Sequence, residues 1–186
     1  MSLFYKLAIS MGFVVLCSNY LVQFPIHYYG LSEILTYGAF SYPVTFLITD
    51  LANRAYGTFV ARKIVYIGFF TGIILTLLIS TNFTDVISLR IAVGSGVAFF
   101  IAQNLDIKVF DKLRKMSWYI APLLSSILGS IVDTFLFFSI AFYATEIPWL
   151  SLALGDLTVK LFIAISMLVP FRLLLSSIRD FSETKS

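Results

Sequence analysis

An aspartate and a lysine lie in the middle of two long apolar segments, where charged side chains are rare. Asp133 interrupts residues 118–143, and Lys160 interrupts residues 150–175. Counted from the connection between the two segments, at 1.5 Å per helical residue, both side chains lie about 15 Å deep. A charge at that depth costs on the order of 3 kcal/mol unless it faces protein or water. We therefore expect Asp133 and Lys160 to belong to a polar site.

Three arrangements of this lysine are compatible with the spacing. Lys160 could pair directly with Asp133, or both could line a pocket and bind complementary edges of a polar ligand. Lys160 could also pair with Asp156, one helical turn earlier. Small and polar residues occupy the helix face around Asp133, which permits close helix packing or leaves room for a ligand. They are Ser125, Ser126, Gly129, Ser130 and Thr134.

A second polar group follows a proline in the stretch FSYPVTFLITDLANRAYG, residues 40–57. Pro43 removes a backbone donor and is expected to kink its helix. Asp50, Asn53 and Arg54 then share one helix face, and Gly57 permits a tight turn after them. They form either part of the site or a solvated helix end with an Asp50–Arg54 ion pair.

A third polar group ends the apolar segment that runs from residue 87 to residue 107. Gln103 lies deepest, and it could bind a ligand or form an ordinary hydrogen bond between helices. Asp106 lies one turn further along. The complete set of candidate residues for substrate binding or translocation is Asp133, Lys160, Asp50, Asn53, Arg54, Gln103, Asp106 and Ser126.

The overall composition places these residues in a membrane protein. Of the 186 residues, 59% are hydrophobic and 12% are charged, with a mean hydropathy of +0.94. A soluble domain has about 25% charged residues. The net charge of +3 is small, and no basic run suggests binding to nucleic acid.

Six apolar segments predict an all-α integral membrane protein, with one transmembrane domain over residues 1–186. We read the first segment as a retained helix, because no clear signal-peptide cleavage site follows it. The connections are short, which favours a single six-helix bundle. The expected helices are 7–24, 31–49, 64–79, 87–107, 118–143 and 150–175.

Lysine and arginine residues predict the orientation of the bundle. They gather before the first helix, after the second and fourth, and at the end of the sixth, whereas the other side has only Arg90. By the positive-inside rule, both termini are cytoplasmic. The basic residues on that side are Lys6, Arg54, Arg62, Lys63, Lys108, Lys112, Arg114, Lys115, Arg172, Arg179 and Lys185.

Motifs of catalytic chemistry are missing from the sequence. No Walker A loop, GxSxG or HExxH motif is present, and one His with one Cys cannot form a zinc site. We therefore expect no catalytic residues, no metal and no cofactor.

The stretch YPVTFLITDLANRAYG resembles the signature of the queuosine precursor transporter family, also labelled vitamin-uptake-transporter-like. The similarity continues through AQNLDIKVFDKLR, through the segment around Asp133 and through GDLTVK to VPFR, covering about residues 40–175. The resemblance implies a bacterial inner-membrane importer of 7-cyano-7-deazaguanine or a related 7-deazaguanine. It also implies a fold similar to the substrate-binding subunits of energy-coupling-factor vitamin transporters.

This substrate class agrees with the polar residues. Asp133 or Asp50 could accept hydrogen bonds from N1–H and the 2-amino group of a deazaguanine, and Gln103, Asn53 or Lys160 could donate to its O6. Phe46, Phe99 and Trp118 offer aromatic faces for stacking. Transport could be driven by protons or by separate energy-coupling chains, and a homo-oligomer is compatible with either.

Three other functions remain open at this point. The chain could be the substrate-binding subunit of an uptake system for a vitamin such as biotin or a thiamine precursor. It could be a membrane-embedded enzyme that modifies a lipid headgroup, with Asp50, Asp106 and Asp111 near one interface. It could also be a structural assembly subunit, although that does not explain two charges at matching depth.

Overall fold

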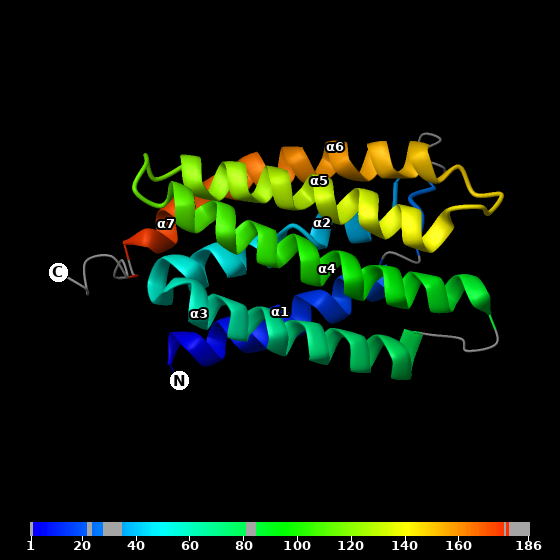
Figure 1. Cartoon of the computed structure of the whole chain (residues 1–186), viewed down its shortest axis with the longest axis horizontal. Helices are drawn as coiled ribbons and strands as arrows, with labels where there is room; N and C mark the ends of the chain where they lie inside the picture. The colour runs from blue at the N-terminus through cyan, green and yellow to red at the C-terminus, as the bar shows by residue number, and fades with distance from the viewer. Residues whose placement is uncertain (1, 22–23, 28–34, 81–84, 177, 179–186) are drawn as a thin grey trace.

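Backbone N–H and C=O groups find no water inside a bilayer, so the apolar segments of this chain must satisfy them within helices. The computed structural model describes residues 2–21, 24–27, 35–80, 85–176 and 178, and these are helical apart from connections and one β-bridge between Pro25 and Thr36. The helices lie roughly side by side as one elongated bundle (Figure 1). They are α1 (Leu3–Leu21), α2 (Gly38–Ser41), α3 (Val44–Leu75), the π-helical η2 (Thr76–Ser80), α4 (Val86–Leu113), α5 (Ile120–Phe142), α6 (Trp149–Ser166) and α7 (Leu168–Leu175).

Five stretches of the described residues are long and apolar enough to cross a membrane. They are Leu3–Leu21, Gly38–Leu78, Val86–Leu113, Ile120–Phe142 and Trp149–Leu175. The all-α membrane architecture is therefore confirmed at this coarser level. The start of the expected helix 31–49 lies outside the described residues, as do Arg179 and Lys185.

The expected connection between helices 31–49 and 64–79 is too long. Residues 50–63 belong to α3 and are helical apart from the break at Gly57, so the half-buried Arg54 and Arg62 lie on helical turns instead of on a loop. The expected end of the fourth helix at residue 107 is also too early, because α4 continues to Leu113. Neither residues 50–63 nor residues 108–113 contain a proline. Their charged side chains are compatible with helical backbone hydrogen bonds, so the helices continue through them.

Gly57 breaks α3 into two arms that run in opposite directions. Its backbone angles of φ 77° and ψ 179° are not helical. On the first arm, Thr49 contacts Gln103 and Asn53 contacts Ile107, so this arm runs in the same direction as α4.

On the second arm the order along α4 is reversed. Tyr66 stacks on Phe100, and Ile73 lies against Gly96. Figure 1 shows the same reversal of the ribbon. The tight turn expected at Gly57 is therefore confirmed, and it replaces a longer loop.

Replacing Gly57 with alanine is expected to destabilise this turn. Residues with a side chain essentially do not occupy this region of backbone space, and forcing one there costs about 1–3 kcal/mol. We expect the G57A variant to unfold at lower denaturant concentration in detergent micelles than the parent. Ala55→Gly, two residues earlier in regular helix and only half-buried, is the control, and it should lose only about 1 kcal/mol. Equal losses would contradict the strain at Gly57.

Two prolines mark the other breaks. The predicted interruption at Pro43 is confirmed, since α2 ends at Ser41 and α3 begins directly after the proline. The expected last helix divides into α6 and α7 at Met167. Pro170 has no N–H to donate to the carbonyl of Ser166, which ends the first of these two helices.

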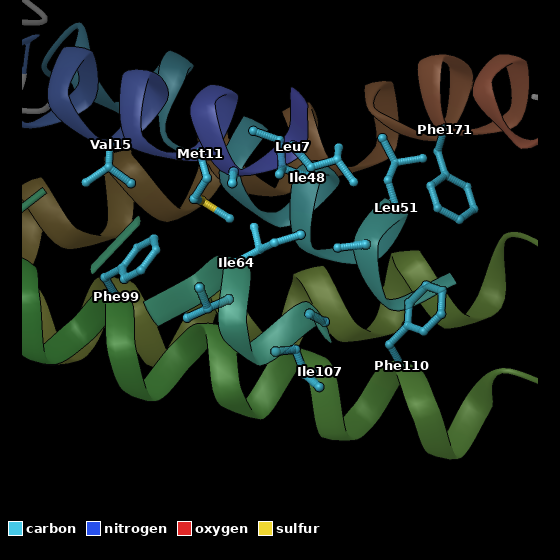
Figure 2. Packing of buried hydrophobic residues seen from close by; sticks show 14 of the residues in the cluster. Leu7, Met11, Val15, Ile48, Leu51, Ile64, Phe99, Ile107, Phe110 and Phe171 are labelled. Atoms are coloured by element: carbon cyan, nitrogen blue, oxygen red, sulfur yellow. The ribbon is translucent and has the colours of Figure 1, made fainter. Parts of the chain in front are cut away.

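The apolar core lies where α1, both arms of α3, α4 and α7 meet. Met11 of α1 and Ile64 of α3 are fully buried at its centre, and Phe110 and Phe171 close one end (Figure 2). Many Phe, Leu and Ile side chains point outward instead, as expected for contact with lipid.

The two ends of the bundle differ in charge. The beginning of α1, the Gly57 turn, the α4–α5 connection and the end of α7 lie together at one end, here named the terminal end (Figure 1). The described basic residues of these elements gather there. At the opposite end Arg90 donates to the carbonyls of Ile140 and Tyr143, which close the last turn of α5.

Candidate functional site

Lys160 is the centre of a buried cluster of charges between α5 and α6. Its Nζ lies 2.9 Å from Asp133 Oδ2 and 2.5 Å from Asp156 Oδ2. It also donates to Thr134 Oγ1 at 3.2 Å, and Thr134 donates to Asp156 at 2.8 Å. The lysine is 3% exposed, so these partners replace water around its ammonium group.

Tyr42 completes the cluster from the opposite side. Its hydroxyl donates to Asp133 Oδ1 at 2.9 Å, and the Lys160 ammonium lies 5.0 Å from the centre of its ring. Tyr42 lies between α2 and α3, where the break before Pro43 turns its side chain toward α5 and α6. Tyr42 is not among the site residues expected from the sequence, and its position directly before the helix-breaking proline was the available signal.

A cavity of about 370 Å³, including its open mouth, lies against this cluster and is here named the charged cavity. The wall combines charged and polar groups with the aromatic faces of Tyr42 and Phe137. Its lining residues are Ser18, Asn19, Gly38, Tyr42, Ser95, Ala98, Asp133, Phe137, Asp156 and Lys160.

The three arrangements considered for Lys160 therefore occur together. The lysine pairs with Asp133 and with Asp156, and all three side chains line the same cavity. Two carboxylates and one ammonium group leave one excess negative charge at their ordinary ionisation. The cavity wall is thus suited to a ligand that presents several hydrogen-bond donors.

Asn19 organises the polar wall on the α1 side of the cavity. Its side-chain amide donates to Thr76 at 2.7 Å, and its carbonyl oxygen accepts from Ser95 at 2.8 Å. Ser18 shares a hydrogen bond with Ser41 at 2.8 Å. These bonds connect α1 with η2, α4 and α2, so the cavity lies at the meeting point of several helices.

Asp50 and Ser126 lie in a separate polar group on the terminal side of this cavity. Asp50 accepts from Ser125 at 3.2 Å and from Ser126 at 3.3 Å. Asp50 and Ser126 also line a second cavity of about 300 Å³, which Phe46, Ser130 and Phe171 help to enclose. Asp106, from α4, interacts with Asp50.

Gln103, Asn53 and Arg54 connect α3 to α4. Gln103 accepts from Thr49 at 2.5 Å and donates to Thr45 at 2.8 Å. Asn53 donates to the Ile107 carbonyl at 3.0 Å.

Two arginines complete this connection. Arg114 donates to Asn53 Oδ1 at 2.7 Å, and Arg54 donates to the Arg114 carbonyl at 3.2 Å. Gln103 and Asn53 thus use their polar groups in hydrogen bonds within the protein. Gln103, Asn53 and Arg54 do not line the charged cavity. A direct role for them in binding substrate stays a prediction.

The aromatic residues proposed for stacking lie elsewhere. Phe99 packs in the core (Figure 2). Its ring is nearly perpendicular to that of Tyr42, with the ring centres 6.3 Å apart. Trp118 lies under the guanidinium of Arg172, 4.9 Å from its ring centre. Phe46 lines the second cavity. Tyr42 and Phe137 take the expected place at the charged cavity instead.

Comparison with known sequences identifies the family. The sequence model of the family described as "Putative vitamin uptake transporter" matches residues 36–175, which include every element that builds the charged cavity except α1. The chain belongs to this family. The matched region begins before Tyr42 and ends with α7.

Three bacterial relatives extend the match over most of the chain. A "Probable queuosine precursor transporter" of Haemophilus influenzae is 36% identical over 85% of this chain and 80% of its own length. The "Queuosine precursor transporter" of Escherichia coli is 34% identical over 91% of this chain and 87% of its own length. A "Probable queuosine precursor transporter" of Bacillus subtilis is 29% identical over 85% of this chain and 81% of its own length. No solved structure matches the chain.

Family membership makes the chain a membrane transporter and not an enzyme. The charged cavity then lies where a transporter needs a polar binding site, surrounded by helices and away from lipid. Asp133 and Lys160 are the residues at its centre that the sequence singled out.

Proposed function

We propose that this chain imports a queuosine precursor, 7-cyano-7-deazaguanine or a related 7-deazaguanine, through the bacterial inner membrane into the cytoplasm. The observation that carries the proposal is the cavity at Asp133 and Lys160 in a chain of this family. The names of three relatives supply the substrate class.

The charged cavity supports this substrate class. A carboxylate has about four lone-pair positions, and Asp133 uses one for Tyr42 and one for Lys160. The remaining positions suit the adjacent N1–H and 2-amino donors of a deazaguanine. Lys160 is placed to donate to O6, and the ring faces of Tyr42 and Phe137 suit a flat bicycle.

We further propose six membrane crossings, with the terminal end in the cytoplasm. The reversal at Gly57 divides the stretch Gly38–Leu78 into two crossings. The basic residues at the terminal end favour the cytoplasmic side by the positive-inside rule. Resemblance to the vitamin-binding subunits of energy-coupling-factor transporters remains a prediction, as do partner chains and a homo-oligomer.

Import is tested by measuring queuosine in transfer RNA. The reporter cells cannot synthesise the precursor. They express this chain and are supplied with a low external concentration of 7-cyano-7-deazaguanine. We expect the parent to restore queuosine and the Asp133→Asn variant to fail at equal membrane level, because the amide cannot replace the carboxylate as the partner of Lys160. A well-expressed parent that restores nothing would contradict the proposal and favour a vitamin substrate.

A further inference from the structure

Two buried carboxylates, Asp50 of α3 and Asp106 of α4, lie next to each other on the terminal side of the charged cavity. They are 2% and 0% exposed. The two side chains are electrostatic neighbours, and Ser125 of α5, which donates to Asp50, lies near Asp106 as well. The two aspartates come together because the first arm of α3 runs along α4. The hydrogen bond from Asn53 to the Ile107 carbonyl sets the register, with Asp50 one turn before Asn53 and Asp106 directly before Ile107.

Asp106 lacks the partners that a buried charge requires. Within the described residues, neither of its oxygens meets hydrogen-bond geometry with any group, although Asp50 and Ser125 are its nearest polar neighbours. Asp50 has the two serine hydroxyls as donors. Two carboxylates in contact repel each other if both are charged, so such a pair binds a cation or shares a proton.

No described basic side chain forms an ion pair with either aspartate. Four cationic groups on the surrounding helices bind elsewhere. Arg54 donates to the Arg114 carbonyl, Arg114 binds Asn53 and Asp111, Arg172 lies over Trp118, and Lys160 binds Asp133 and Asp156. These four groups therefore do not balance the charge of the pair.

The second cavity gives this pair a polar neighbourhood. Asp50, Ser126 and Ser130 line it, and the hydroxyl of Ser130 is also buried without a partner among the described residues. These serines share the polar face of α5 with Asp133, and Phe46 packs on Gly129 between the two groups. The carboxyl pair and the charged cavity are thus two distinct sites along one helix.

We propose that Asp50 and Asp106 share a proton, and that the release of this proton on the cytoplasmic side drives import through the charged cavity. The inference rests on the proposed import function. A single shared proton removes the repulsion between two neighbouring carboxyl groups. Among the described residues no third acidic group, His or Cys joins the pair to hold a metal ion. Protonated outside and deprotonated inside, the pair would link substrate movement to the proton gradient.

The experiment uses the full chain in liposomes and labelled 7-cyano-7-deazaguanine as the probe. An outward-acid difference of about one pH unit supports about tenfold accumulation if one proton moves with each substrate molecule. We expect the parent to accumulate the probe, and the Asp106→Asn variant to take it up equally with and without the gradient. Asp111→Asn, an exposed aspartate on the same helix, is the matched control and should respond like the parent.

A second measurement does not depend on transport. Infrared spectroscopy of the purified parent at neutral pH should show the C=O band of a protonated carboxyl group, and Asp106→Asn should lose it. Absence of this band, or unchanged gradient dependence in Asp106→Asn, would overturn the shared proton. Accumulation that follows a sodium gradient instead would reassign the pair to sodium. A parent that moves no probe in exchange assays, yet shows the band, would contradict the import function and leave the proton site standing.

Discussion

Replacing Lys160 with methionine should abolish import and lower the stability of the protein. The substitution leaves Asp133 and Asp156 buried on one wall without the ammonium group that both contact. Removing one partner of a buried ion pair costs about 3–5 kcal/mol, because the remaining charge has neither water nor a counter-ion. We expect little protein in the membrane and no queuosine in the transfer RNA of the reporter cells.

A double variant separates stability from binding. Lys160→Met combined with Asp156→Asn removes one charge of each sign, so the cluster keeps the net charge of the parent. We expect this variant to recover membrane level and thermal stability in part, but not import, since Asp133 still lacks its cationic partner. Asp156→Asn alone keeps the Lys160–Asp133 pair and serves as the control. Import by the double variant at the parent's rate would show that Lys160 has only a structural role.

Replacing Gly129 with leucine should produce the second large effect. A Cβ atom at this position would lie 2.5 Å from Cε1 of the Phe46 ring, which is buried between α3 and α5. Overpacking of this kind costs about 1–3 kcal/mol and occasionally more, and four added carbon atoms place G129L at the upper end. We expect a lower melting temperature in detergent and a loss of import larger than the loss of membrane protein.

Two further variants test whether the Phe46 ring is the cause. Gly12→Ala is a milder change, because its new Cβ would meet only the Thr71 methyl group at 3.3 Å. It should retain nearly full import. Combining Gly129→Leu with Phe46→Ala exchanges volume across the same contact and should recover stability relative to either single variant. Additive losses in the double variant would indicate that the two residues do not interact.

The central ion pair was predictable because its geometry depends on few variables. α5 and α6 follow each other through a short connection, so equal distances from that connection bring Asp133 and Lys160 to equal depth. Tyr42 was not predictable in the same way. Its position depends on how the short α2 and the break at Pro43 fold back over α5, which hydrophobic patterning does not encode.

The contact between Asp50 and Asp106 was beyond the sequence for a different reason. It requires the direction and register of the first α3 arm along α4, which the buried bonds of Asn53 and Gln103 stabilise. The sequence marked all four residues as polar and near a helix end. The sequence did not distinguish Asn53 and Gln103, which connect helices, from Asp50 and Asp106, because this distinction depends on contacts between distant segments.

In the proposed six-crossing topology, the turn at Gly57 also decides which compartment receives the C-terminus. Five crossings would leave the two termini on opposite faces of the membrane, and counting the two arms of α3 as separate crossings makes the number even. If the break at Gly57 is overlooked, the continuous helical stretch Gly38–Leu78 counts as one crossing, and every later segment is assigned to the opposite face. Reporter fusions after Leu113 and after Leu175 should therefore both report the cytoplasm, and a tag inserted at Gly57 should interrupt a helical hairpin that has no loop to accept it.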